Sequence, residues 1–149
     1  GRPPAAWTRH AWSSVDVFEC KPGGPPQHCA RDVAWLRGRA CHACVAIGNP
    51  APFVRALSDA GATVARSEFR RDHAPWSAAH AAALADRAAR ESCDLATTWK
   101  DWTKLRTALA GSANRAAVSV VVPRVEIEFL KGQEDVQRAL RTALKAPRG

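Results

Sequence analysis

The sequence predicts an α/β fold: a mostly parallel sheet with helices on both faces, in three α/β/α layers. Short apolar or alternating segments of strand type are separated by amphipathic segments of helical type along most of the chain. Residues 40–47 (ACHACVAI) form an almost continuous apolar run, which is typical of a strand covered on both faces. Helices that connect parallel strands must cover the sheet, so this alternation predicts a helical layer on each side.

The first half of the chain is predicted to contain three strands, recognised by alternating or continuous apolar side chains: residues 14–19, 40–47 and 62–69. A short helix is predicted at 30–36, and another runs from Pro50 to Ala60. Asn49 offers an N-cap oxygen to this second helix, and Pro50 suits its first turn, where a missing N–H costs nothing. Residues 1–13 are predicted to be an irregular N-terminal segment.

The second half of the chain adds helices and strands in alternation. The predicted helices are 77–90, 98–110 and 133–145, and the predicted strands are 93–97, 117–122 and 125–129. Thr98-Trp-Lys-Asp101 has the spacing of a capping box, with Asp in place of the usual Glu. Only Pro123 and Arg124 separate the last two strands, so these predict an antiparallel edge pair near the C-terminus. Residues 14–149 are thus predicted to form a single domain.

Composition narrows the class of protein and of partner. The 149 residues carry a formal net charge of +8 and are 46% hydrophobic, as expected for one soluble globular domain. The positive charge favours anionic partners, which include phosphates, nucleic acid and an acidic membrane face. No run of about 18 apolar residues occurs, so no transmembrane helix is predicted. The chain lacks Met even at its start, which predicts a processed protein or a piece of a longer one.

Cysteine usage raises the question of zinc. The five cysteines are an odd number, which favours reduced thiols in a cytoplasmic setting. Cys41 and Cys44 have the CxxC spacing of zinc ligands, and three further soft ligands lie upstream: Cys20, His28 and Cys29. The same segment is predicted to be a buried strand, in which residues three apart point to opposite faces and cannot easily share a metal. We therefore predict core thiols and no zinc.

Glycine-rich loops that bind nucleotide phosphates are absent from the sequence. Neither GxxxxGK[ST] nor GxGxxG occurs, and Gly111-Ser-Ala-Asn114 is too short and lacks the lysine. The chain by itself is therefore not expected to be an ordinary P-loop kinase.

Three segments follow predicted parallel strands and are expected to meet at one edge of the sheet, where sites in α/β proteins lie: residues 48–50, 70–76 and 97–101. Asp72 and His73 form an acid–imidazole pair that can move protons or bind phosphate, although a plain surface loop has the same pattern. Lys100 and Asp101 open a helix after Thr98. That helix start either binds an anion or is simply capped.

Taken together, these segments resemble a known family. The residues are Ala46-Ile-Gly-Asn-Pro50 with Phe53, then Asp72-His73, then Thr98-Trp-Lys-Asp101 with Lys104-Leu105, and the lead-in Leu36-Arg-Gly-Arg39. In order and spacing they resemble the C-terminal half of tetraacyldisaccharide 4'-kinases, which phosphorylate a lipid A precursor. The sequence departs from the family pattern at three positions. Ala46 replaces a glycine, Trp99 replaces a glutamate, and Trp102 replaces a small residue.

The resemblance implies ATP-dependent, Mg²⁺-assisted phosphoryl transfer to the 4'-hydroxyl of a tetraacyldisaccharide 1-phosphate. The family's phosphate-binding loop and catalytic aspartates belong to an N-terminal P-loop kinase domain, on the same or a separate chain. By resemblance, His73 would assist a catalytic aspartate at the interdomain cleft, and Asp72 would orient the His73 loop. The cleft-shaping or phosphate-binding residues would be Asn49, Thr98, Lys100 and Asp101. The substrate would be an anionic glycolipid at the cytoplasmic face of the bacterial inner membrane.

A second hypothesis of a different class remains open. The basic charge and the missing phosphate loop also suit a non-catalytic α/β module that binds phosphorylated lipid or nucleic acid. Nucleic acid binding favours aromatic residues interleaved in a basic groove, and the six tryptophans are scattered instead. No nucleic acid partner is therefore expected.

Overall fold

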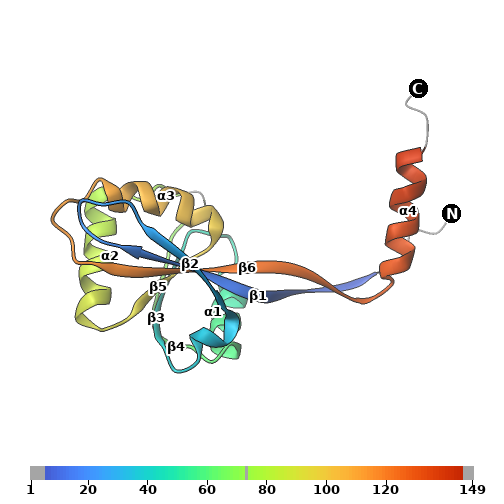
Figure 1. Cartoon of the computed structure of the whole chain (residues 1–149), viewed down its shortest axis with the longest axis horizontal. Coiled ribbons are helices and arrows are strands. Elements are labelled where there is room, and N and C mark those ends of the chain that lie inside the picture. Colours follow the sequence, from blue (N-terminus) through green and yellow to red (C-terminus); the bar gives the residue numbers. More distant parts are fainter. Residues whose placement is uncertain (1–5, 73, 146–149) are drawn as a thin grey trace. The chain divides into compact units, whose positions relative to one another are not determined.

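The computed structural model describes residues 6–72 and 74–145 (Figure 1). These residues divide into two compact units: those within 13–124, and a smaller unit made by those within 1–12 and 125–149. The strands are β1 (Trp7–Cys20), β2 (Gln27–Asp32), β3 (Ala40–Val45), β4 (Thr63–Phe69), β5 (Asp94–Ala96) and β6 (Val118–Lys131). The helices are α1 (Ala51–Asp59), α2 (Ala78–Arg90), α3 (Trp99–Ala110) and α4 (Gln133–Lys145), with a 3-10 turn at Val33–Leu36.

The predicted α/β class is confirmed. The six strands form one sheet in the order β2-β1-β6-β5-β3-β4. The pairs β3–β4, β3–β5 and β5–β6 are parallel, whereas β1 and β2 are antiparallel. Helices α2 and α3 contribute to the main apolar core together with one face of the sheet, whereas Leu57 of α1 is buried outside that core. Connecting helices of parallel strands thus supply both outer layers.

The structure corrects the predicted antiparallel pair at the C-terminus. Residues 118–131 form a single strand, β6, that continues through Pro123 and Arg124. A two-residue hairpin needs positive φ at its centre, which Pro cannot adopt and Arg rarely does. The antiparallel edge pair is instead formed by β2, the strand at one edge of the sheet, with its neighbour β1. Their register runs from Ser14 opposite Asp32 to Glu19 opposite Gln27.

Three local predictions also differ from the structure. Strand β1 begins at Trp7, inside the segment predicted to be irregular, and β6 is its neighbour in the sheet. Residues 30–32 belong to β2, and the helical turn starts only at Val33, because the Asp32 side chain accepts the Ala34 N–H at 2.7 Å. Asn49 does not cap α1. Pro50 occupies the N-cap position, without a side-chain hydrogen bond.

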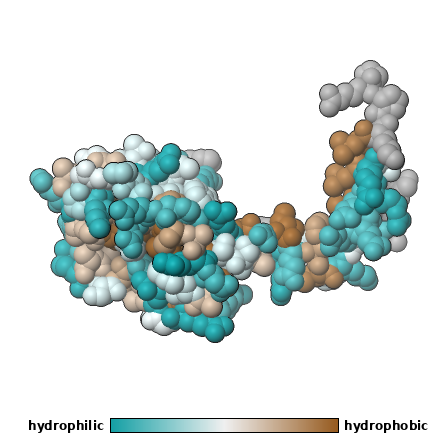
Figure 2. Space-filling model, viewed as in Figure 1, coloured by the Kyte–Doolittle hydropathy of each residue, from teal (hydrophilic) through white to brown (hydrophobic). Residues whose placement is uncertain are grey.

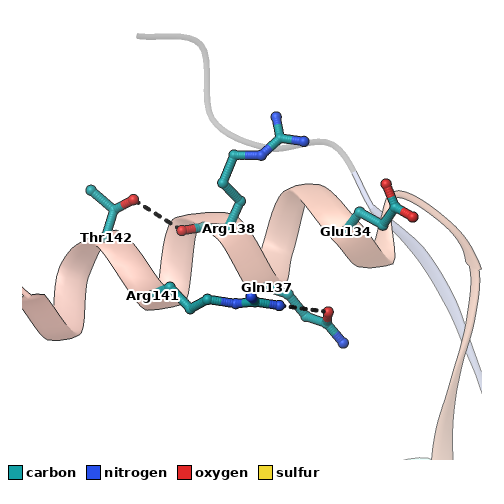
Figure 3. Close-up of a pocket in the computed structure, with 5 residues that line it drawn as sticks. All are labelled: Glu134, Gln137, Arg138, Arg141 and Thr142. Atoms are coloured by element: carbon teal, nitrogen blue, oxygen red, sulfur yellow. Dashed lines mark hydrogen bonds between the residues drawn. The ribbon is translucent and has the colours of Figure 1, made fainter.

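The smaller unit contains the outer parts of β1 and β6 together with α4. Arg9 Nε donates to Glu128 Oε2 at 2.7 Å between its two strands. Its large exposed apolar side chains are Trp7, Val125, Ile127, Leu130, Leu140 and Leu144, and Figure 2 shows apolar surface on these strands and on α4. Among the described residues, the hollow in Figure 3 is lined by side chains of α4. Within the helix, Arg141 bonds to Gln137 and Thr142 to the Arg138 carbonyl. A ligand in this hollow would therefore find groups from only one of the described secondary-structure elements.

The cysteines are free thiols, and four of the five are buried. Burial raises the pKa of Cys20 to about 11 and that of Cys41 to about 12, and it also raises the pKa of Cys44. Within the described residues, no group of three His, Cys, Asp or Glu side chains is placed to hold a metal ion. No helix in that part of the chain is long and apolar enough to span a membrane.

The burial of the thiols predicts their reactivity. Only Cys29 is partly exposed. Because the thiolate is the reactive form, we expect one thiol to react rapidly with a chromogenic disulfide reagent at about pH 8 in the native protein. All five cysteines should react in denaturant. The Cys29→Ser variant should lose the fast phase. Rapid reaction of two or more native thiols would contradict this assignment.

Candidate functional site at the strand carboxyl ends

A buried hydrogen-bond network joins the carboxyl end of β3 to the start of α3. Thr97 Oγ1 donates to the Cys44 carbonyl at 2.6 Å. Asp101 is fully buried, and its Oδ2 accepts the Ala46 N–H and the Thr98 hydroxyl, both at 2.9 Å. The Thr98 Oγ1 in turn accepts the Asp101 N–H at 3.2 Å. These bonds fix the loop after β3 against the N-terminus of α3.

This hydrogen-bond network departs from the usual capping box. In that motif the acidic side chain reaches back to the N–H of its own cap residue. Here the Asp101 carboxylate instead takes the Ala46 N–H, which belongs to the chain leaving the adjacent strand. Asp101 is therefore a positioning residue in this geometry, because protein groups occupy Oδ2 and Oδ1 is buried. Thr98 is the N-cap, as predicted.

The loop after β4 reaches the same helix start. Lys100 Nζ donates to Asp72 Oδ1 at 2.6 Å, and both side chains are partly exposed. The structure thus brings together two of the segments that the sequence predicts to converge. Asn49 is exposed after β3, and His73 lies outside the described residues. Lys100 thus lies in the first turn of α3, where the helix dipole is positive, and its amino group is already paired with Asp72.

A second cluster joins the end of β4 to the start of α2, and sequence reasoning missed it. His80 Nε2 pairs with the Glu68 carboxylate, while His80 Nδ1 lies 3.4 Å from an Arg70 nitrogen. The Arg70 guanidinium lies 5.2 Å from the centre of the Trp76 ring. Ser77 caps α2 by accepting the His80 N–H. The contacts of this cluster fix both ends of the 70–76 loop; only the helical cap was visible in the sequence.

Comparison with known proteins decides the family. A family model described as tetraacyldisaccharide-1-P 4'-kinase matches residues 6–145.

The chain belongs to the tetraacyldisaccharide 4'-kinase family.

Several curated relatives carry the name tetraacyldisaccharide 4'-kinase. The protein from Methylobacterium radiotolerans is 39% identical over 127 residues, which cover 83% of this chain and 36% of the relative. That from Bradyrhizobium diazoefficiens is 43% identical over 101 residues, covering 67% of this chain and 28% of the relative. That from an Anaeromyxobacter species is 36% identical over 112 residues, covering 74% and 29%. The chain thus spans about a third of the length of these relatives. No solved structure matches it.

The tetraacyldisaccharide 4'-kinase resemblance is thereby confirmed, and the structure explains one departure from the family pattern. Trp102 is buried and stacks on Phe18 of β1, with ring centres 4.4 Å apart. The larger side chain fills the space between α3 and β1, so it is part of the core. Trp99, the other unusual residue on α3, keeps 43% of its surface exposed.

Proposed function

We propose that this chain is the C-terminal part of an ATP-dependent lipid kinase that phosphorylates the 4'-hydroxyl of a tetraacyldisaccharide 1-phosphate. The observation that carries the proposal is the family match over residues 6–145. The contact between Asp72 and Lys100 supports it, because it joins two of the family motifs at one edge of the sheet. Parallel α/β sheets place their sites at this edge.

The chain's own residues would act by positioning and by charge. Phosphoryl transfer needs little covalent help from the protein, so orientation and neutralisation of negative charge dominate its catalysis. Lys100 would hold Asp72 and thereby the adjacent His73, which would hydrogen-bond the reacting hydroxyl or a catalytic carboxylate of the other domain. Asn49 and Thr98 would shape the wall of the cleft. Asp101 would keep the α3 N-terminus in place.

The described residues do not fit an ATP–Mg²⁺ site. They provide no group of three metal-ligating side chains, and the sequence has no glycine-rich phosphate loop. ATP and Mg²⁺ would be bound mainly by an N-terminal P-loop kinase domain, on the same or a separate chain. The net charge of +8 suits an anionic glycolipid at the surface of the bacterial inner membrane, on its cytoplasmic face.

The second candidate is a non-catalytic basic module that binds phosphorylated lipid. The same missing phosphate loop favours it.

An activity comparison separates the two candidates. The isolated chain should transfer no γ-phosphate from ATP above background. The chain joined to the N-terminal part of the Methylobacterium radiotolerans relative should phosphorylate tetraacyldisaccharide 1-phosphate, with the intact relative as the positive control. Product would be followed by mass spectrometry. Turnover by the isolated chain, abolished by a substitution within it, would contradict the assignment of ATP to the other domain. An inactive joined chain beside an active relative would favour the non-catalytic module.

A further inference from the structure

A charged cluster that no family motif includes lies on the antiparallel side of the sheet. Asp16 of β1 is fully buried. Its Oδ2 accepts Arg124 Nε at 2.6 Å, and its Oδ1 accepts Arg124 Nη2 at 2.9 Å and lies 2.6 Å from His28 Nε2. Three strands that are neighbours in the sheet, β2, β1 and β6, supply these side chains.

The exposed side of this cluster is formed by the two basic side chains. Burial by itself would raise the pKa of Asp16, but the hydrogen bonds from Arg124 and His28 outweigh burial and hold that pKa below its usual value. The carboxylate therefore stays ionised and lies beneath the two basic side chains. The Arg124 and His28 side chains are 52% and 44% exposed. Arg124 Nη1 takes no part in the bonds to Asp16, so its N–H groups can donate to a ligand. His28 Nδ1 is also not bonded to Asp16, and it donates to a phosphate oxygen when the ring carries both protons.

Aromatic side chains border the cluster. Phe18 stacks on His28 with ring centres 4.9 Å apart, and meets Trp99 edge to face at 5.8 Å. Phe18 points to the core that contains α3, and so does Asp16 two residues earlier, because alternate strand residues share a face. The cluster therefore lies on the α3 side of the sheet. Trp99 directly precedes Lys100, so an exposed aromatic ring links the cluster to the candidate site.

We propose that Arg124 and His28 form a binding site for a phosphate monoester carried on a sugar, with the sugar ring packed against Trp99. An arginine fork fits the geometry of phosphate oxygens, and a carboxylate behind the arginine fixes its orientation before the ligand arrives. That the sugar phosphate is the 1-phosphate of the acceptor glycolipid rests on the proposed function. The binding site itself does not depend on it.

A matched pair of variants tests the site. Arg124→Gln removes the fork, whereas Arg31→Gln removes an exposed charge of the same kind on β2. Arg31 pairs with the buried Val15, so it lies on the sheet face opposite Asp16. We expect the 149-residue chain to bind glucosamine 1-phosphate in a calorimetric titration. Arg124→Gln should weaken this binding by about ten-fold or more, as expected for a lost charged hydrogen bond. Arg31→Gln should change it by less than about two-fold.

Further arms identify the ligand and guard against unfolding. Trp99→Ala should lower the affinity for glucosamine 1-phosphate but leave that for inorganic phosphate unchanged. His28→Gln should weaken both. Amide NMR spectra check that each variant is folded, and Arg124→Lys replaces Arg124→Gln if that variant is not.

Equal affinities of the Arg124 and Arg31 variants for glucosamine 1-phosphate would overturn the proposed site. Equal affinity of the unchanged chain for glucosamine 1-phosphate and inorganic phosphate would overturn the proposal that the sugar ring contributes to binding. Because these titrations need no ATP, they can succeed where the kinase assay fails, or the reverse.

Discussion

Replacing His73 with alanine in a chain that carries the N-terminal kinase domain is expected to lower kcat by about 10²–10⁴-fold, the usual range for a lost general acid–base group. Asp72, the preceding residue in the sequence, is held by Lys100 at 2.6 Å, at the edge where the parallel strands end. Replacing a histidine outside a protein's core typically changes the free energy of unfolding by only about 0.5 kcal/mol. Steady-state kinetics and thermal unfolding of the same preparation measure both quantities.

His80→Ala is the contrasting variant for this prediction. From the sequence alone, replacing a histidine on this alanine-rich helix is expected to have almost no effect on turnover or stability. The structure instead pairs His80 with Glu68 and places it beside Arg70 and Trp76. We therefore expect His80→Ala to lower thermal stability more than turnover, the opposite of His73→Ala. If His73→Ala keeps full turnover, or loses it only in proportion to its loss of folded protein, the role assigned to His73 is wrong.

Local signals explain which parts of the fold could be predicted. Helices α2 and α3 start where the sequence predicts, because Ser77 and Thr98 cap them through their own side chains. The continuous strand β6 could not be read from the sequence. Pro123 is a common turn residue, and only the pairing with neighbouring strands makes an extended path through it favourable.

The candidate site was predictable to a similar degree. The approach of Asp72 to Lys100 follows from the rule that the carboxyl ends of parallel strands share an edge. The cluster of Asp16, His28 and Arg124 could not be found in that way. Its members come from three strands, and their meeting depends on the register between them, which a one-residue slip would destroy. Likewise, the spacing of Asp101 predicted a cap but could not show that its partner is the Ala46 N–H.

Asp101→Ala is expected to destabilise the protein by about 3 kcal/mol. The buried carboxylate accepts the Ala46 N–H and the Thr98 hydroxyl, and its removal leaves a buried N–H unpaired, which costs about 1–3 kcal/mol. The loss of a negative charge in the first turn of α3 adds about 0.3–1 kcal/mol. Urea unfolding of the isolated chain measures the difference.

Asp72→Ala is the matched control, since it removes a carboxylate from the same edge. Its pair with Lys100 is partly exposed, so we expect a change below about 1 kcal/mol. The comparison also separates the two roles considered for Asp101. A positioning residue loses stability when replaced, and its effect on the affinity for glucosamine 1-phosphate follows from the unfolded fraction. A phosphate-contacting residue would instead change that affinity while the unfolding midpoint stayed the same. An unchanged urea unfolding midpoint for Asp101→Ala would therefore contradict a stabilising role for the buried hydrogen-bond network between β3 and α3.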